Sequence, residues 1–131
     1  MKLLLDTHIW IWAVSRPEKL SRAVRREIDN PRNELFLSPI SIWEAHHLCR
    51  RGRLGIKGSF QSALPGLLTQ LPLKEAPFDF LVAAESSRIQ LPQADIGDTL
   101  LAATASVLGL TFVTADTQLL NCAWLKTLAN R

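Results

Sequence analysis

The sequence has 131 residues, a length that suits one folded domain. Hydrophobic residues make up 47% of the chain and charged residues 21%, which allows a buried core and excludes an intrinsically disordered chain. The net charge of +3 permits binding to nucleic acid but is too small to establish it. We therefore expect one globular domain that spans residues 1–131.

Three features of the chain predict a cytoplasmic protein that is not embedded in a membrane. Cys49 and Cys122 lack the spacing of metal ligands and are expected to be free thiols in a reducing compartment. Asp6 ends the apolar N-terminal run too early for a secretory signal. The longest stretch without a charged residue, between Asp98 and Asp116, is shorter than the roughly 20 residues that a membrane helix needs.

Short apolar runs alternate with helical patterns along the chain. In chain order, the sequence predicts a strand at Lys2–Leu5, helices at His8–Val14 and Ser21–Asp29, a strand at Glu34–Leu37, helices at Pro39–Arg50 and Ser59–Leu68, a strand at Gln70–Leu73, helices at Phe78–Arg88 and Ile96–Leu108, a strand at Thr111–Thr114, and a candidate fifth strand at Ala123–Leu128. This alternation predicts an α/β protein whose parallel sheet is covered on both faces. The strands are almost continuously apolar, as buried parallel strands are.

Helix-terminating residues support several of these boundaries. Ser38 followed by Pro39 is a typical N-cap with proline at the first helical position. Asp95, three residues before Asp98, is expected to cap the helix that begins at Ile96. Gly109 follows the same helix and predicts its C-terminal end.

Two aspartates are expected at one edge of the sheet. Asp6 directly follows the first strand, and Asp116 lies two residues beyond the strand that ends at Thr114. In an open parallel sheet, ligands bind beyond the carboxyl ends of the strands. The sequence therefore places both carboxylates where a ligand site is expected.

Two further acids lie on helices that are otherwise apolar. Glu44 has Ile40 and Leu48 as its neighbours one turn away on either side, so it falls on a face that should pack against the core. Asp98 lies in the first turn of an apolar helix. Each acid also has a purely structural explanation. Asp6 and Asp116 could cap the helices that follow them, Asp98 could complement a helix dipole, and Glu44 could lie on the surface.

The combination favours a metal site over four separate structural roles. No Lys or Arg adjoins Asp6, Asp98 or Asp116 in the sequence to balance a cluster of negative charge. Carboxylate oxygens are ligands for hard cations, so we expect Mg²⁺ or Mn²⁺. Such ions activate water and stabilise the leaving oxygen when a phosphodiester bond is hydrolysed.

At these residues the sequence resembles the PIN-domain family and, within it, the VapC-type toxins of toxin–antitoxin pairs. The matching stretches are LLLDTH at residues 3–8, SPISIWE at 38–44, DIGDTLLAATA at 95–105 and GLTFVTAD at 109–116. The resemblance implies an α/β/α sandwich with a four- to five-stranded parallel sheet. It also implies a metal-dependent endoribonuclease that cuts tRNA or rRNA, forms a homodimer and is blocked by a cognate antitoxin.

Carried over motif by motif, the resemblance assigns the catalytic and metal-binding roles to Asp6, Glu44, Asp98 and Asp116. Thr114 matches a hydroxyl position that supports the site, and Asp95 is expected to support it as a cap. The sequence departs from the family at Thr99, where relatives often carry a basic residue.

Two groups of residues near these acids keep alternative interpretations. Arg50, Arg51 and Arg53 either complement the dipole at the end of the Pro39–Arg50 helix or contact RNA phosphates near Glu44. Three tryptophans also recur near the acids, and packing in the core or against a partner is favoured over base stacking; they are Trp10, Trp12 and Trp43.

Two other functions stay open at this point. One is a non-catalytic PIN-like binding module. The other is a phosphatase or phosphotransfer domain on a doubly wound sheet. A haloacid-type phosphatase needs a second aspartate two residues after the first, and this sequence has His8 there.

Overall fold

The computed structural model describes residues 1–131 and contains one five-stranded sheet, in which the strand order is β3-β2-β1-β4-β5. All neighbouring strands are parallel, as the alternation of strands and helices predicted. The strands are β1 (Lys2–Leu5), β2 (Glu34–Leu37), β3 (Leu73–Glu75), β4 (Thr111–Thr114) and β5 (Thr127–Ala129).

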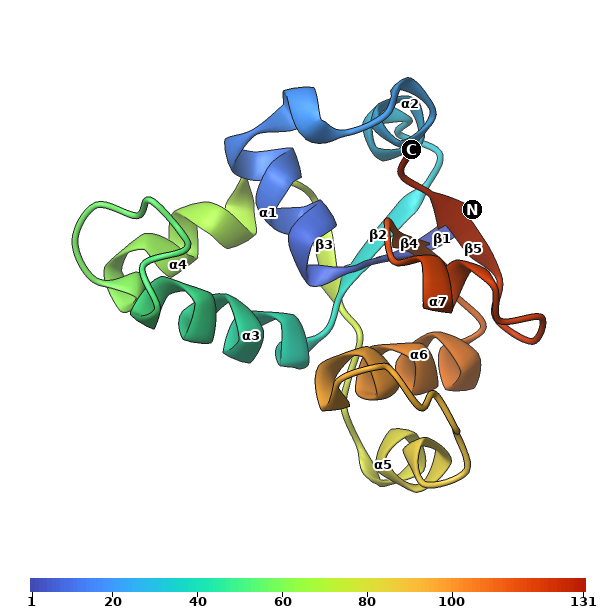
Figure 1. The fold of residues 1–131 in the computed structure, drawn as a ribbon. Coiled ribbons are helices and arrows are strands. Elements are labelled where there is room, and N and C mark those ends of the chain that lie inside the picture. The colour runs from blue at the N-terminus through green and yellow to red at the C-terminus, as the bar shows by residue number, and fades with distance from the viewer.

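Helices cover both faces of this sheet (Figure 1). They are α1 (Thr7–Ser15), the 3-10 turn η1 (Pro17–Lys19), α2 (Arg22–Asp29), α3 (Pro39–Arg50), α4 (Phe60–Thr69), α5 (Phe80–Ser86), α6 (Ile96–Leu108) and α7 (Thr117–Leu120). In Figure 1, α1 to α4 lie to one side of the sheet and α5 to α7 to the other. The predicted α/β/α sandwich is therefore confirmed.

The side chains of the central strand explain the two layers. Successive strand residues point to opposite faces, so Leu3 and Leu5 enter one apolar cluster and Leu4 enters the other. The first cluster contains Trp10 from α1, and the second contains Leu101 from α6. Burial on both faces anchors the two central strands β1 and β4, whose carboxyl ends carry the aspartates of interest.

Two strands lie further towards the C-terminus than the sequence predicted. The third strand is Leu73–Glu75 rather than Gln70–Leu73, because α4 runs to Thr69 and Pro72 lacks the N–H that a ladder needs. The fifth strand is Thr127–Ala129 rather than Ala123–Leu128, because a turn comes first, in which the Leu125 N–H donates to the Cys122 carbonyl. The short helix α7 had not been predicted.

The predicted helix ends at the site are confirmed. The Ser38 hydroxyl accepts a hydrogen bond from the Ile40 N–H at the start of α3. Gly109 ends α6 in the left-handed conformation with φ of 66°, which glycine adopts at no steric cost. Both cysteines are free thiols. None of the helices combines the length and the apolar character that crossing a membrane would require.

Candidate active site

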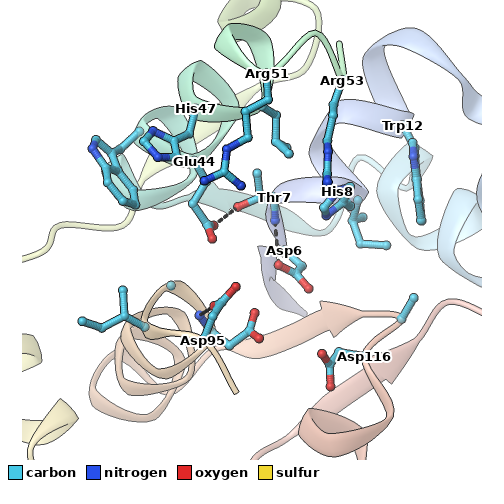
Figure 2. Close-up of a pocket in the computed structure, with 17 residues that line it drawn as sticks. Asp6, Thr7, His8, Trp12, Glu44, His47, Arg51, Arg53, Asp95 and Asp116 are labelled. Carbon is cyan, nitrogen blue, oxygen red and sulfur yellow. Dashed lines mark hydrogen bonds between the residues drawn. The ribbon is translucent and has the colours of Figure 1, made fainter. Parts of the chain in front are cut away.

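A cleft of about 690 Å³ opens at the carboxyl edge of the sheet, and all four predicted acids line it (Figure 2). The ends of β1 and β4 form its floor, while α3 and α6, which contact each other, contribute from its sides. The acidic side chains in the cleft are Asp6, Glu44, Asp95, Asp98 and Asp116. Residues that lie far apart in the sequence are therefore brought to one place.

The two strand-end aspartates are joined through one threonine hydroxyl. Thr114, at the end of β4, donates to Asp6 Oδ2 at 2.6 Å and accepts the Asp116 N–H at 3.1 Å. Asp6 Oδ1 accepts the Thr7 N–H at 2.8 Å and caps α1. Thr114 thus links the Asp6 carboxylate to the backbone at Asp116.

Asp116 caps α7 with only one of its two carboxylate oxygens. Its Oδ1 accepts the N–H groups of Gln118 at 2.8 Å and Leu119 at 3.2 Å. The structural explanation of Asp6 and Asp116 as helix caps is therefore correct. Capping does not exclude a ligand, because an ionised carboxylate has about four lone-pair positions.

Glu44 is held in the cleft by a hydroxyl pair that sequence reasoning missed. The Thr7 hydroxyl donates to Glu44 Oε1 at 2.5 Å and lies 2.9 Å from the Ser41 hydroxyl. A threonine has one proton to donate, so Ser41 donates to Thr7 when Thr7 donates to Glu44. Both hydroxyl residues are buried. The available signal was that Thr7 adjoins Asp6 and that Ser41 lies one turn before Glu44. Only the packing of α1 against α3 brings the two hydroxyl groups together.

Gly97 leaves the space that Glu44 occupies. A Cβ at this position would lie 2.8 Å from the Cδ atom of Glu44, which is closer than real carbon contacts. Gly97 is buried inside the first turn of α6, where glycine is unfavourable for helix stability. The cost in helix stability is consistent with a need for room beside the Glu44 carboxylate.

The start of α6 supplies the remaining two acids. Asp95 is the N-cap, and its Oδ1 accepts the Asp98 N–H at 2.8 Å, as predicted. Asp98 lies in the first turn and lines the cleft. Thr99, the position at which the sequence departs from the expected family pattern, does not line it.

Burial and mutual repulsion raise the pKa values of three of these acids. The pKa of Asp98 rises to about 7, first because of burial and then because of the negative charges of Asp95, Asp6, Asp116 and Glu44. Burial also raises the pKa of Asp6 and of Glu44, although the hydrogen bonds from Thr114 and Thr7 oppose these shifts. None of the four salt bridges of the chain involves an acid of the cleft.

The donor set suits a hard divalent cation in its chemistry. Every candidate ligand is a carboxylate oxygen, and such oxygens are preferred by Mg²⁺ and Mn²⁺. No three His, Cys, Asp or Glu side chains are gathered closely enough to hold an ion as they stand. Asp6, Glu44, Asp98 and Asp116 thus line one cleft without converging on one point, and joint coordination requires their side chains to turn inward.

The wall of the cleft that α1 and α3 form is mainly basic and aromatic, although α3 also contributes Glu44. Arg51 and Arg53 line it, whereas Arg50 does not. Figure 2 shows both arginine side chains extending from the end of α3 towards the cleft. His8 and Trp12 of α1 and Trp43 and His47 of α3 complete this wall.

Comparison with known proteins assigns the family. The α/β/α sandwich and the acids at the carboxyl edge of its parallel sheet agree with the PIN-domain family that the sequence resembles. The model of the PIN domain family matches residues 3–125. The chain therefore belongs to the PIN domain family. No match was found among curated protein sequences.

Solved structures share the fold over nearly the whole chain. A chain of VapBC2 from Rickettsia felis, bound to a DNA fragment from its promoter, superposes with a TM-score of 0.75 at 21% identity and 100% coverage of both chains. DNA-bound VapBC from Salmonella typhimurium gives 0.67 at 17% identity, with 98% of each chain covered. A toxin–antitoxin complex from Klebsiella pneumoniae gives 0.65 at 18% identity, covering 97% of this chain and 96% of the other.

Gly97→Ala is expected to displace Glu44 and to lower any cleavage activity of the cleft by roughly ten- to hundredfold, since small misplacements of reacting groups have effects of this size. The fold should be retained, because alanine favours the helix more than glycine does. Gly66→Ala in α4 is the matched control, since a Cβ there meets nothing within 4 Å. Equal activity of the two variants would contradict the proposed contact.

The metal-free protein is expected to lose stability as the pH rises from 5 to 8. The pKa of Asp98 is about 7 in the fold, against about 4 in the unfolded chain. Between these values the folded state binds more protons, so stability falls with rising pH, and the full penalty is present above pH 7. Asp98→Asn should flatten this dependence in thermal melts with EDTA. Parallel pH profiles for the two proteins would contradict the assignment.

Proposed function

We propose that this protein is a metal-dependent endoribonuclease and the toxin of a toxin–antitoxin pair. The observation that carries the proposal is the cleft in a PIN fold that Asp6, Glu44, Asp98 and Asp116 line together. These four carboxylates come from two strand ends and two helices, and no salt bridge neutralises them. Repulsion of this kind favours a site in which a cation compensates the charge.

In this proposal the residues that would hold Mg²⁺ or Mn²⁺ are Asp6, Glu44, Asp98 and Asp116. When bound, such an ion would supply an activated water and would stabilise the oxygen that leaves when the phosphodiester bond is hydrolysed. Thr114 and Thr7 orient Asp6 and Glu44 through their hydroxyl groups. Asp95 orients the first turn of α6 and thereby Asp98.

Cleavage of RNA with the four acids intact tests this proposal against the non-catalytic alternative. The purified protein is incubated with total RNA and Mn²⁺, and the fragments are separated on a denaturing gel. Discrete fragments are expected, as an endonuclease produces. A full-length RNA profile at all protein concentrations would favour a binding module.

The proposed partners are a second copy of the chain and a cognate antitoxin. The related structures from Rickettsia felis and Salmonella typhimurium are VapBC proteins, and the one from Klebsiella pneumoniae is described as a toxin–antitoxin complex. Exposed apolar side chains are typical of interfaces, and this chain exposes Phe80 at 96%, Leu81 at 69% and Ile96 at 71%.

The protein is expected to be a dimer at tens of micromolar, and Phe80→Ser should weaken that dimer. Light scattering of the two proteins at several concentrations measures this. A monomeric wild type would contradict the dimer.

For the second partner, an antitoxin encoded next to the gene should block RNA cleavage when it is added in excess. Unchanged cleavage would contradict that pairing.

A further inference from the structure

Two residues of α3 and the residue that caps its C-terminus form a stripe along one wall of the cleft. Trp43, His47 and Arg51 follow one another at intervals of four residues, so they share one face at the end of the helix, and all three line the cleft. The rings of Trp43 and His47 stack, with centroids 5.0 Å apart and an angle of 23° between their planes. Trp43 nevertheless remains 54% exposed.

The neighbouring tryptophans do not share this position. Trp10 is 1% exposed and belongs to the core, which is one of the packing roles that the sequence analysis favoured for the tryptophans. Trp12 is half-buried, with the Lys19 ammonium 5.5 Å from its ring and the His8 ring 5.7 Å away. Trp43 is therefore the more exposed of the two tryptophans that line the cleft, and the His47 ring stacks on it.

The charges around Trp43 point to a polyanion. Arg51 and Arg53 line the same wall, and neither forms a salt bridge with an acid of the chain. Asp95 and Asp116 lie across the cleft from the arginines, whereas Glu44 extends from α3 next to Trp43 (Figure 2). If the phosphates of a nucleic-acid strand lie along the arginines, one phosphate would reach the carboxylates and the bases would lie beside Trp43.

We propose that Trp43, supported by His47, is a binding platform for an unpaired base of the substrate, and that Arg51 and Arg53 contact the adjacent phosphates. This proposal rests on the proposed ribonuclease function and adds a recognition surface to it. Stacking on an aromatic ring requires an open base face, which a paired strand does not offer. The proposed occupant is therefore a single-stranded segment of RNA rather than a duplex.

Binding without cleavage tests the platform. A fluorescein-labelled adenosine ribonucleotide 12-mer is titrated with the full-length protein in EDTA at low salt, and anisotropy gives Kd. Trp43→Leu is expected to weaken binding by roughly five- to hundredfold, the range for loss of one stacked base. Trp43→Phe should retain most of the affinity. Trp124→Leu is the matched control, because Trp124 is 50% exposed but does not line the cleft.

Three results would overturn the platform. The first is an equal Kd for Trp43→Leu and wild type, with unchanged melting temperatures, and the second is equal binding of the 12-mer and its duplex. The third is that the wild type fails to bind the 12-mer even at 100 times the protein concentration that is used in the cleavage assay. Loss of antitoxin binding without loss of RNA binding in Trp43→Leu would assign the surface to the protein partner instead. Binding through Trp43 combined with no cleavage in Mn²⁺ would refute the proposed function alone.

The arginines have a separate readout in the salt dependence of binding. Each phosphate contact on a single strand contributes about 0.7 to the slope of log K against log salt concentration. Arg51→Met and Arg53→Met are each expected to lower this slope by about that amount. Arg50→Met is the matched control, since Arg50 is exposed and adjacent but does not line the cleft. Equal slope changes for Arg50→Met and Arg51→Met would contradict phosphate contacts within the cleft.

Discussion

Asp116→Asn is expected to lower RNA cleavage by at least about a hundredfold while leaving the fold intact, since it removes a charged ligand from the proposed metal site. Only Oδ1 of Asp116 accepts hydrogen bonds from α7, and an asparagine retains an oxygen for that purpose. Asparagine is also as good an N-cap as aspartate. The substitution thus removes one negative charge from the cleft and little else.

Asp29→Asn makes the same chemical change at the exposed end of α2 and should cleave RNA at the wild-type rate. Asp6→Asn should lose activity as Asp116→Asn does, but both oxygens of Asp6 accept hydrogen bonds, so its melting temperature is a less clean control. Rates are compared on one validated RNA substrate at equal protein concentration. Wild-type cleavage by Asp116→Asn would show that the catalytic site lies elsewhere.

Divalent metal is expected to raise the melting temperature of the wild-type protein by on the order of 10 °C. Binding to the folded state at 100 times the dissociation constant adds roughly 2.7 kcal/mol to the free energy of unfolding. For a chain of this length, that energy corresponds to a shift of this size. The ion also relieves the repulsion that, together with burial, raises the pKa of Asp98.

Asp98→Asn should raise the melting temperature in EDTA and reduce the shift that Mn²⁺ produces. Asp98 is the better choice for this test because no hydrogen bond of its carboxylate offsets burial and repulsion. The melts are recorded at pH 7.5 with EDTA or with millimolar Mn²⁺, at constant ionic strength so that general screening does not contribute. Equal shifts in both proteins would mean that the ion stabilises the fold from another place.

Apolar runs and helix caps were sufficient to predict the elements that build the site. The predicted bounds of β1, β2, α3, α6 and β4 agree with the structure. The edge strands β3 and β5 were less predictable, because each has a neighbour on one side only and fewer buried side chains. Their positions depend on turns around Pro72 and Leu125, whose extent the apolar pattern does not specify.

The gathering of the acids could be predicted because parallel strands end at a common edge. Asp6 and Asp116 follow two adjacent strands, and this required only the correct sheet. The contacts of Thr7 with Ser41 and Glu44, and the space left by Gly97, depend on how α1, α3 and α6 pack. No local pattern specifies that packing, so these residues appear only in the structure.

The most direct measurement of the central claim is RNA cleavage by the wild-type protein and by Asp116→Asn, each with millimolar Mn²⁺ and with excess EDTA. Discrete RNA fragments are predicted only for the wild type with Mn²⁺, because the acids of the cleft and the ion are both required. The same fragments from the wild type in EDTA, or from Asp116→Asn with Mn²⁺, would contradict a metal-dependent site at this edge of the sheet.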